Sequence, residues 1–272
     1  MKIGIQGEKF SWHYLASQKL YGKNIEILFY KEFSDVFRAQ DKGDIDFGLV
    51  AIENSVYGSI VPVYQELSKR NYFINGEVKL QINQCLLALP STKLEEITDV
   101  YSHPVALNQC HAWLENNLPQ ADQHAYFDTA MSAIKVSKSS DKISAIGPAE
   151  LANDLDLQIL ARDINVGSNY TRFISFSNSK DVADDANKTS IILTTSHKEG
   201  ALYDALGCFA KEKINLTKLE SHPVTGRAWE YQFYIDLDCR FNQKKFKSAE
   251  KNLINQGAKV QVIGCFLADD ML

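Results

Sequence analysis

The first part of the chain alternates short apolar runs with stretches of helical spacing. Apolar runs at residues 3–5, 25–29 and 47–52 predict strands, and the last has the continuous apolar character of a strand covered on both faces. Ser11 is positioned to cap a helix after the first run, and Ser34 to cap one after the second. Strands that alternate with short helices predict a mostly parallel α/β sheet.

The same pattern continues through the middle of the chain. Four apolar residues with helical spacing predict a helix after the third strand; they are Ile60, Val63, Tyr64 and Leu67. Further elements are predicted from the same signals, and they are a strand at 85–89, a helix after Pro104, a helix from Thr129 and a strand at 143–147. We therefore expect two α/β lobes with a cleft between them.

The acidic segment 181–188 has no apolar period and is predicted to be a linker. Beyond it the pattern predicts strand, helix, strand, strand, helix and strand, at residues 189–195, 201–211, 216–221, 229–237, 243–256 and 259–267. This βαββαβ order is typical of a ferredoxin-like domain. The first and last of these strands are rich in β-branched residues, which favours central positions in the sheet.

Composition narrows the class of protein. The chain has 272 residues, 45% of them hydrophobic, and this length and apolar content suit a globular protein of two domains. The 29 Lys+Arg and 34 Asp+Glu residues give a net charge of −5, and this acidity argues against a nucleic-acid partner. No apolar run approaches the roughly 18 residues of a membrane span, and no signal peptide is visible, so we expect a cytoplasmic protein without a membrane partner. The five cysteines never form CxxC, which argues against a disulfide framework and a bound metal.

Three predicted strand ends carry polar residues, and ligands of open parallel sheets collect at such ends. They are segments 53–55, 102–104 and 167–173, and Gln109 follows the second on the predicted helix. Each also has a purely structural interpretation. The first is then a capped strand-to-helix loop, the second a helix cap, and the third an ordinary amphipathic strand.

Strand alternation separates the residues of the third segment. It puts Thr171 and Phe173 on one face and Arg172 on the other. Arg172 is therefore open to two roles, contact with a carboxylate ligand or structural pairing. His103 is a candidate general base, but its neighbour Ser102 does not provide the geometry of a catalytic triad.

Together these segments and the C-terminal module resemble the prephenate dehydratase family, in which a catalytic domain precedes an ACT regulatory domain. The matching residues are Glu53-Asn54-Ser55 with Gly58, Ser102-His103-Pro104 through Gln109-Cys110, Thr171-Arg172-Phe173, Gly200-Ala201-Leu202, Ile214-Asn215-Leu216 and Glu220-Ser221-His222-Pro223. His222 stands where the family usually has Arg. The resemblance implies a two-lobed, periplasmic-binding-protein-like catalytic domain with a cleft at 1–180, a linker at 181–188 and a ferredoxin-like ACT domain at 189–272.

The resemblance also implies an activity. Prephenate would lose CO2 and water to give phenylpyruvate in phenylalanine biosynthesis, and no cofactor is needed because aromatisation drives the reaction. Thr171 is the implied catalytic residue, a donor to the leaving hydroxyl. Substrate contacts are implied for Glu53, Asn54, Ser55, Ser102, Gln109, Asp128, Thr129, Arg172 and Phe173. A threonine hydroxyl is a poor acid, so Glu53 and Asp128 are candidate proton donors if burial raises their pKa.

Feedback regulation by phenylalanine is implied for the C-terminal module. The helix start at Gly200, Ala201 and Leu202 would offer free N–H groups to the effector carboxylate. Glu220 and Ser221 would face it from a second copy of the chain, which predicts a homodimer or homotetramer.

Two other functions stay open. Arogenate dehydratase would act on the amino analogue of prephenate, and no residue distinguishes the two substrates. A non-catalytic module that binds small molecules is the other alternative, because two-lobed α/β clefts also serve as solute binders. From the length of the chain we expect no chorismate mutase segment.

Overall fold

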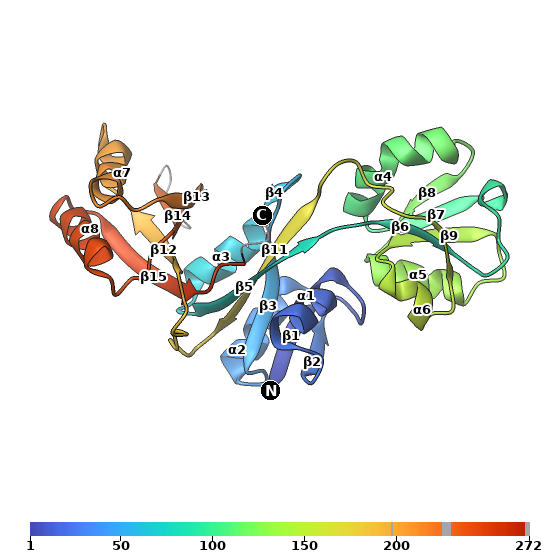
Figure 1. Ribbon diagram of the computed structural model, residues 1–272, viewed down its shortest axis with the longest axis horizontal. Coiled ribbons are helices and arrows are strands. Elements are labelled where there is room, and N and C mark those ends of the chain that lie inside the picture. Colours follow the sequence, from blue (N-terminus) through green and yellow to red (C-terminus); the bar gives the residue numbers. More distant parts are fainter. Residues whose placement is uncertain (197, 225–229, 270–272) are drawn as a thin grey trace. The chain divides into compact units, whose positions relative to one another are not determined.

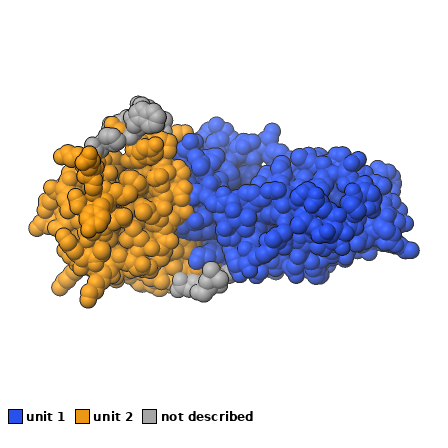
Figure 2. All heavy atoms as spheres, turned by 90° about the horizontal axis from the view of Figure 1, so that it is seen from above, with its two compact units in different colours: residues 1–66, 78–173 blue, residues 67–77, 174–272 orange. Residues whose placement is uncertain are grey.

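The computed structural model describes residues 1–196, 198–224 and 230–269. The chain divides into two compact units, coloured separately in Figure 2: unit 1 comprises residues 1–66 and 78–173, and unit 2 comprises 67–77 and 174–272. The predicted domain limits at 180 and 188 are not tested by this division and stay predictions.

The first sheet of unit 1 is parallel where it was predicted to be. Strand β1 (Lys2–Gln6) lies between β2 (Glu26–Tyr30) and β3 (Phe47–Asn54) and pairs with both in parallel (Figure 1). Helices α1 (Trp12–Tyr21) and α2 (Phe33–Lys42) connect these strands. Because parallel strands end at the same edge, the residues after β1, β2 and β3 are brought together there.

The two predicted helix caps have different outcomes. Ser11 caps α1, since its Oγ accepts a hydrogen bond from the N–H of Tyr14 over 3.3 Å. The prediction for Ser34 is wrong, because α2 already begins at Phe33. The Asp35 carboxylate accepts the backbone N–H of Glu32 over 3.2 Å, and this stabilises a helix start two residues earlier.

The second sheet of unit 1 has the strand order β10-β6-β9-β7-β8. Its strands are β6 (Cys85–Ala88), β7 (Asp99–Ser102), β8 (Asp122–Ala125), β9 (Ile143–Gly147) and β10 (Gln158–Ala161). Leu86 and Ala88 pack in the cluster that contains α4 (Pro104–Asn117), whereas Cys85 and Leu87 pack with α5 (Thr129–Ser137) and α6 (Glu150–Asp154). Burial on both faces explains why this strand is apolar throughout.

Four further elements complete the first part of the chain: the short β4 (Gly58–Ser59), α3 (Val61–Lys69), β5 (Phe73–Gln81) and the 3₁₀ turn Leu94–Glu96. Strand β11 (Tyr170–Ser177) follows β10 and lies beside β3 in the strand order. β5 and β11 each run from one unit into the other. The neighbouring ends of β3 and β11 position the site described below.

Unit 2 has the predicted βαββαβ order. Its elements are β12 (Lys188–Thr194), α7 (Ala201–Lys211), β13 (Leu216–Pro223), β14 (Tyr231–Leu237), α8 (Lys244–Asn255) and β15 (Lys259–Phe266). The strand order β13-β14-β12-β15-β5 confirms that β12 and β15 are inner strands, and β13 is an edge strand. Residue 229, the predicted start of β14, lies outside the described residues.

The core of unit 2 forms on one face of this sheet. Ile191 and Leu193 of β12 pack there with Phe209 of α7 and Phe246 of α8. Near its start, β12 is tied to β5 by a buried ion pair, with Lys188 Nζ 2.8 Å from Glu77 Oε1.

Three observations concern other properties of the described residues. All five cysteines are buried and free. Within 1–196, 198–224 and 230–269, no helix has the length and apolar character needed to cross a membrane. The same residues contain no cluster of three or more His, Cys, Asp or Glu side chains with the geometry to hold a metal ion. The expected cytoplasmic location stays a prediction.

Candidate functional site

Unit 1 contains a cavity of about 540 Å³, a volume that suits a small organic ligand. Segments far apart in the sequence form its wall. Six of the ten site residues predicted for the first part of the chain line it, and they are Asn54, Gln109, Asp128, Thr129, Thr171 and Phe173.

Asn54 is the centre of a hydrogen-bond network at the ends of β3 and β11. Its Oδ1 accepts the backbone N–H groups of Val56 and Tyr57, each over 3.0 Å. Those two fixed donors determine the orientation of the amide. Its Nδ2 donates to Asn169 Oδ1 over 2.7 Å and to Thr171 Oγ1 over 3.0 Å.

This network constrains the hydroxyl of Thr171. Because Asn54 donates to Oγ1, the hydroxyl hydrogen of Thr171 is left to donate to a different acceptor. Thr171 lines the cavity, so an oxygen atom of a bound ligand can accept this hydrogen. Both N–H bonds of Asn54 are used on protein oxygens, which makes Asn54 a residue that orients Thr171.

Strand alternation separates the predicted residues as expected. Arg172 is buried, does not line the cavity, and has Nη1 3.6 Å from Glu53 Oε2. The structure therefore favours pairing between side chains over ligand contact for Arg172. Glu53 also lies outside the cavity lining.

Two predicted serines do not line the cavity either. The Ser102 hydroxyl is fully buried and donates to the carbonyl oxygen of Ile146 over 2.8 Å. Ser55 forms two hydrogen bonds with the backbone of Tyr170: its N–H donates to the carbonyl oxygen over 2.8 Å, and its Oγ accepts the Tyr170 N–H over 2.9 Å. Both serines hold strand ends in position.

Helix α4 contributes two polar side chains to the cavity. Gln109 is 8% exposed, and its Oε1 accepts from Gln84 Nε2 over 3.4 Å. His103 caps the helix, since its Nδ1 accepts the N–H of Val105 over 3.2 Å. Burial lowers the pKa of His103, and the nearby Asp128 charge opposes this shift. The neutral ring therefore carries its proton on Nε2 and acts as a donor.

Asp128 is the acidic group of the cavity with a shifted pKa. It caps α5 through Oδ1, which accepts the N–H of Met131 over 2.6 Å. Burial raises the pKa of its carboxyl group, while hydrogen bonds from the backbone N–H groups of Met131 and Ala130 oppose the rise. A carboxyl group with a raised pKa retains its proton at higher pH and can donate it.

Several lining residues were not predicted from the sequence. Lys31 follows β2, Trp12 begins α1, and Phe127 precedes Asp128. Lys31 Nζ lies 5.6 Å from the ring centroid of Phe127. The end of β2 is a fourth polar strand end, with Lys31 and Glu32, and the same rule that selected the other three applies to it.

Three buried polar atoms on lining residues have no hydrogen-bond partner among the described residues. They are Trp12 Nε1, Gln84 Oε1 and Asp128 Oδ2. Buried polar groups are paired in the great majority of cases. Their presence around one cavity fits a polar ligand, and the donor Trp12 Nε1 with the cation Lys31 favours a negatively charged group on it.

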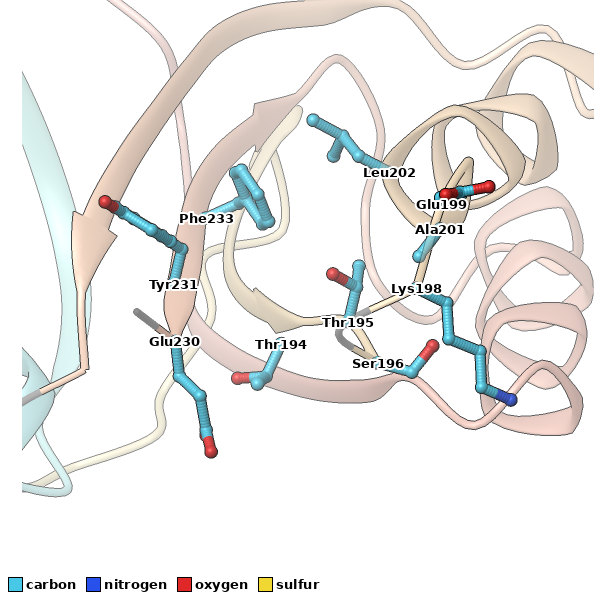
Figure 3. A pocket seen from close by; sticks show the side chains of 10 residues that line it. All are labelled: Thr194, Thr195, Ser196, Lys198, Glu199, Ala201, Leu202, Glu230, Tyr231 and Phe233. Atoms are coloured by element: carbon cyan, nitrogen blue, oxygen red, sulfur yellow. The ribbon is translucent and has the colours of Figure 1, made fainter. Parts of the chain in front are cut away.

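A second cavity, of about 650 Å³, lies in unit 2 (Figure 3). Ala201 and Leu202 at the start of α7 line one side, and Tyr231 and Phe233 of β14 line the other. Gly200 precedes the helix with φ 75°, a backbone conformation that favours glycine. Of the five predicted effector residues, Ala201 and Leu202 line this cavity.

The other three predicted effector residues do not line the cavity: Gly200 precedes α7, and Glu220 and Ser221 belong to the edge strand β13. Glu220 Oε1 lies 3.9 Å from Nε2 of His222. His222 is buried and packs its ring edge-on against Tyr234, with the centroids 5.3 Å apart.

The family model for prephenate dehydratase matches residues 3–181. The chain belongs to the prephenate dehydratase family. The bifunctional chorismate mutase/prephenate dehydratase of Aquifex aeolicus is 31% identical and aligns with 98% of this chain and 73% of its own length. Arogenate dehydratase 2 of Petunia hybrida is 32% identical over 99% of this chain and 72% of its own. Membership in the prephenate dehydratase family makes the protein an enzyme of the dehydratase type and confirms the family predicted from the sequence.

Solved structures share the fold over nearly the whole chain. The prephenate dehydratase of Staphylococcus aureus is 27% identical, with a TM-score of 0.87 and coverage of 98% of this chain and 100% of that one. The Arthrobacter aurescens prephenate dehydratase in complex with L-Phe is 24% identical, with a TM-score of 0.90 over 100% of this chain and 92% of that one. GqqA, described as a novel type of quorum quenching acylase, is 25% identical, with a TM-score of 0.88 over 99% of both chains.

Proposed function

We propose that the unit 1 cavity converts prephenate into phenylpyruvate, CO2 and water. The observation that carries the proposal is the hydrogen bond from Asn54 to Thr171 on the wall of a cavity that also contains Gln109 and Asp128. The family match over residues 3–181 supports the same reaction.

The reaction needs one proton. The prephenate dianion loses CO2 from one ring carbon and its hydroxyl group from the opposite ring carbon, and the electron pair of the broken C–C bond completes the aromatic ring. The departing hydroxide takes up a proton and leaves as water, so the products are the phenylpyruvate anion, CO2 and H2O. The protein must therefore bind two carboxylates and assist the departure of the hydroxide.

The lining residues divide these tasks. Thr171 donates a hydrogen bond to the departing oxygen, and Asp128 supplies the proton, since burial raises its pKa. Donation to a leaving group typically raises a rate by about 10²–10⁴-fold. Lys31 attracts the carboxylates of the substrate. A hydrogen bond to a charged group contributes about 1.5–3 kcal/mol of net stabilisation.

The remaining polar side chains position the substrate. Gln109, Thr129 and the Nε2–H of His103 donate hydrogen bonds to its oxygens, and Phe173 contacts the ring. Four further residues do not contact the substrate themselves but hold the ends of β3, β7 and β11 in position; they are Glu53, Ser55, Ser102 and Arg172.

Incubation of the purified protein with prephenate tests the proposal. Phenylpyruvate is measured by its absorbance in alkali, with a reaction without protein as the control for spontaneous decay. Formation well above that control is expected. Formation equal to the control would overturn the proposal and leave a non-catalytic binding module as the better interpretation.

Arogenate is the second candidate substrate, because a relative named arogenate dehydratase is 32% identical over 99% of this chain. Arogenate carries an ammonium group in place of the keto oxygen, and the lining includes the acidic residue Glu32 beside Lys31. We assign prephenate as the preferred substrate. Measurement of kcat/KM for prephenate and arogenate in parallel decides which substrate is preferred. A higher value for arogenate would reverse the assignment.

We further propose that residues 1–180 form the catalytic domain and that 189–272 form an ACT domain that binds phenylalanine. The βαββαβ order and the cavity beside Ala201 and Leu202 support this. The L-Phe complex of the Arthrobacter aurescens protein, which has the same fold, is consistent with it. Loss of activity with added phenylalanine is the expected result, and unchanged activity up to millimolar concentrations would contradict it.

The effector site would be completed by a second copy of the chain. Gly200, Ala201 and Leu202 bind the carboxylate at the start of α7, and Glu220 with Ser221 reach the ammonium group from the partner. The support is that β13, which carries the last two, is an edge strand. Sedimentation is expected to give a dimer or tetramer, and a species of only about 30 kDa at micromolar concentration would contradict it.

A further inference from the structure

Tyr57 connects two walls of the unit 1 cavity. Its side chain lines the cavity, and its hydroxyl oxygen accepts a hydrogen bond from Asn108 Nδ2 over 2.8 Å. The same hydroxyl donates to the carbonyl oxygen of Val105 over 3.5 Å. Asn108 and Val105 belong to α4, whereas Tyr57 belongs to the loop between β3 and β4. The contact therefore joins segments 51 residues apart in the sequence.

Each end of this bridge is attached to residues of the proposed reaction. The N–H of Tyr57 donates to Asn54 Oδ1 over 3.0 Å, and Asn54 orients Thr171 through Nδ2. On the other side, α4 carries Gln109 and is capped by His103. The bridge consequently fixes the separation between the wall that holds Thr171 and the wall that holds Gln109.

The bridge lies at an edge of the cavity that faces solvent. Tyr57 is 44% exposed and Val105 is 38% exposed. An exposed, neutral hydrogen bond contributes little net free energy, so it can break and re-form as ligands exchange. Its neighbour Gly58 has φ 78°, a left-handed backbone conformation that allows the loop to turn sharply back into β4.

We propose that Tyr57 is a positioning residue whose hydroxyl bridge to Asn108 holds the cavity closed over the substrate. This proposal rests on the proposed function of the cavity. When the bridge is removed, the closed form is populated for a smaller fraction of the time, and KM rises by the reciprocal of that fraction. At saturating substrate the reaction still takes place in the closed form, so kcat changes little.

Steady-state kinetics with prephenate test the bridge in four variants. Tyr57→Phe removes the hydroxyl group and keeps the ring, and Asn108→Ala removes the donor from a residue outside the cavity lining. Each is expected to raise KM about 3–10-fold, the range that one neutral hydrogen bond supports, with kcat within twofold of the unmodified protein. The double variant is expected to match either single variant, because both remove the same bond. Asn116→Ala, on the same helix, is the matched control and should leave KM unchanged, since Asn116 lies outside the cavity lining and donates to the carbonyl oxygen of Ala112 within its own helix.

Hydrogen–deuterium exchange of the 55–59 segment gives a readout that does not require activity. The N–H groups of Val56 and Tyr57 are held by Asn54, so faster exchange is expected in Tyr57→Phe and Asn108→Ala and not in Asn116→Ala. Unchanged exchange would overturn the bridge. A KM that rises in Tyr57→Phe but not in Asn108→Ala would also overturn it, because the hydroxyl would then contact the substrate directly. If the unmodified protein forms no phenylpyruvate, the proposed function fails, and the exchange comparison alone decides the bridge.

Discussion

Asn54 donates a hydrogen bond to the hydroxyl oxygen of Thr171 over 3.0 Å, across the neighbouring strands β3 and β11. The hydroxyl hydrogen of Thr171 is therefore directed to another acceptor. Because Thr171 lines the cavity, a bound ligand can supply that acceptor. The proposed catalytic role of Thr171 depends on this orientation.

Asn54→Asp separates two functions of Asn54, the orientation of Thr171 and the support of the loop at Val56 and Tyr57. An aspartate oxygen can still accept the N–H groups of Val56 and Tyr57, so the loop is expected to keep its conformation. The second oxygen cannot donate to Thr171 or to Asn169, and it instead accepts the hydroxyl hydrogen of Thr171. We expect kcat for prephenate to fall by about 10²-fold with a small change in stability. A variant with normal kcat would show that the orientation of Thr171 is unimportant.

The pH dependence of kcat tests Asp128 as the proton donor. Burial raises the pKa of its carboxyl group, and the protonated form is the active one, so activity is expected to fall as pH rises through that raised pKa. Asn at position 128 retains the cap of α5 but has no acidic proton. Asp128→Asn is therefore expected to lower kcat and to abolish this limb of the pH profile. The same limb in the variant would exclude Asp128 as its source.

His13 is expected to make the protein less stable in mild acid. Burial lowers its pKa from the ordinary 6.5 to about 3, and its Nε2 accepts the N–H of Ala51 over 3.1 Å, which a protonated ring cannot do. Below pH 6.5 the unfolded chain binds a proton at His13 that the folded chain does not, so stability decreases as pH falls. The loss from this residue is about 2 kcal/mol between pH 7 and pH 5.

Urea unfolding at both pH values measures this loss. His13→Gln keeps an acceptor for Ala51 and cannot titrate, so its free energy of unfolding should change by about 2 kcal/mol less than that of the unmodified protein. Equal changes in the two proteins would contradict the assignment.

Phenylalanine affinity is expected to change little between pH 6.0 and pH 8.0. A histidine with an ordinary pKa at position 222 would become charged in acid, as the Arg usual in the family is, and would favour tighter binding there. The structure changes this expectation, because burial lowers the pKa of His222, although the nearby Glu220 charge opposes the shift. His222 is therefore protonated to a smaller extent in this range than an ordinary histidine would be. Calorimetric titration measures the affinity, and clearly tighter binding at pH 6.0 would show that His222 does become protonated.

Local patterns predicted the parts of the site that one strand or one helix determines. Alternation along β11 separated Thr171 from Arg172, and the polar residues after Ile52 marked the last two residues of β3, which ends at Asn54. The cap at His103 and the helical spacing that places Gln109 beside the cavity are equally local. Such signals depend on neighbours within a few residues, which a single sequence contains.

Other parts of the site depend on strand order, which spacing does not encode. The rule of polar strand ends applies to Lys31, but its place beside this cavity follows from the order of β2, β1 and β3 in one sheet. The hydroxyl of Ser102 turns to Ile146 because β7 pairs with β9, so a residue expected to contact substrate stabilises the sheet. The bond between Asn54 and Asn169 joins residues 115 positions apart. The shift of the α2 start from the Ser34 prediction arose from competition between two local caps.

Thr171 provides the most direct test of the central claim that the unit 1 cavity performs the dehydration. The measurement is kcat and KM for prephenate in the unmodified protein, Thr171→Ala and Thr171→Ser, with folding checked by urea unfolding. Removal of a donor that acts in the transition state is expected to lower kcat by about 10²–10³-fold with a modest change in KM, whereas Thr171→Ser retains the hydroxyl group and most of the activity. A folded Thr171→Ala variant with the kcat of the unmodified protein would contradict the account.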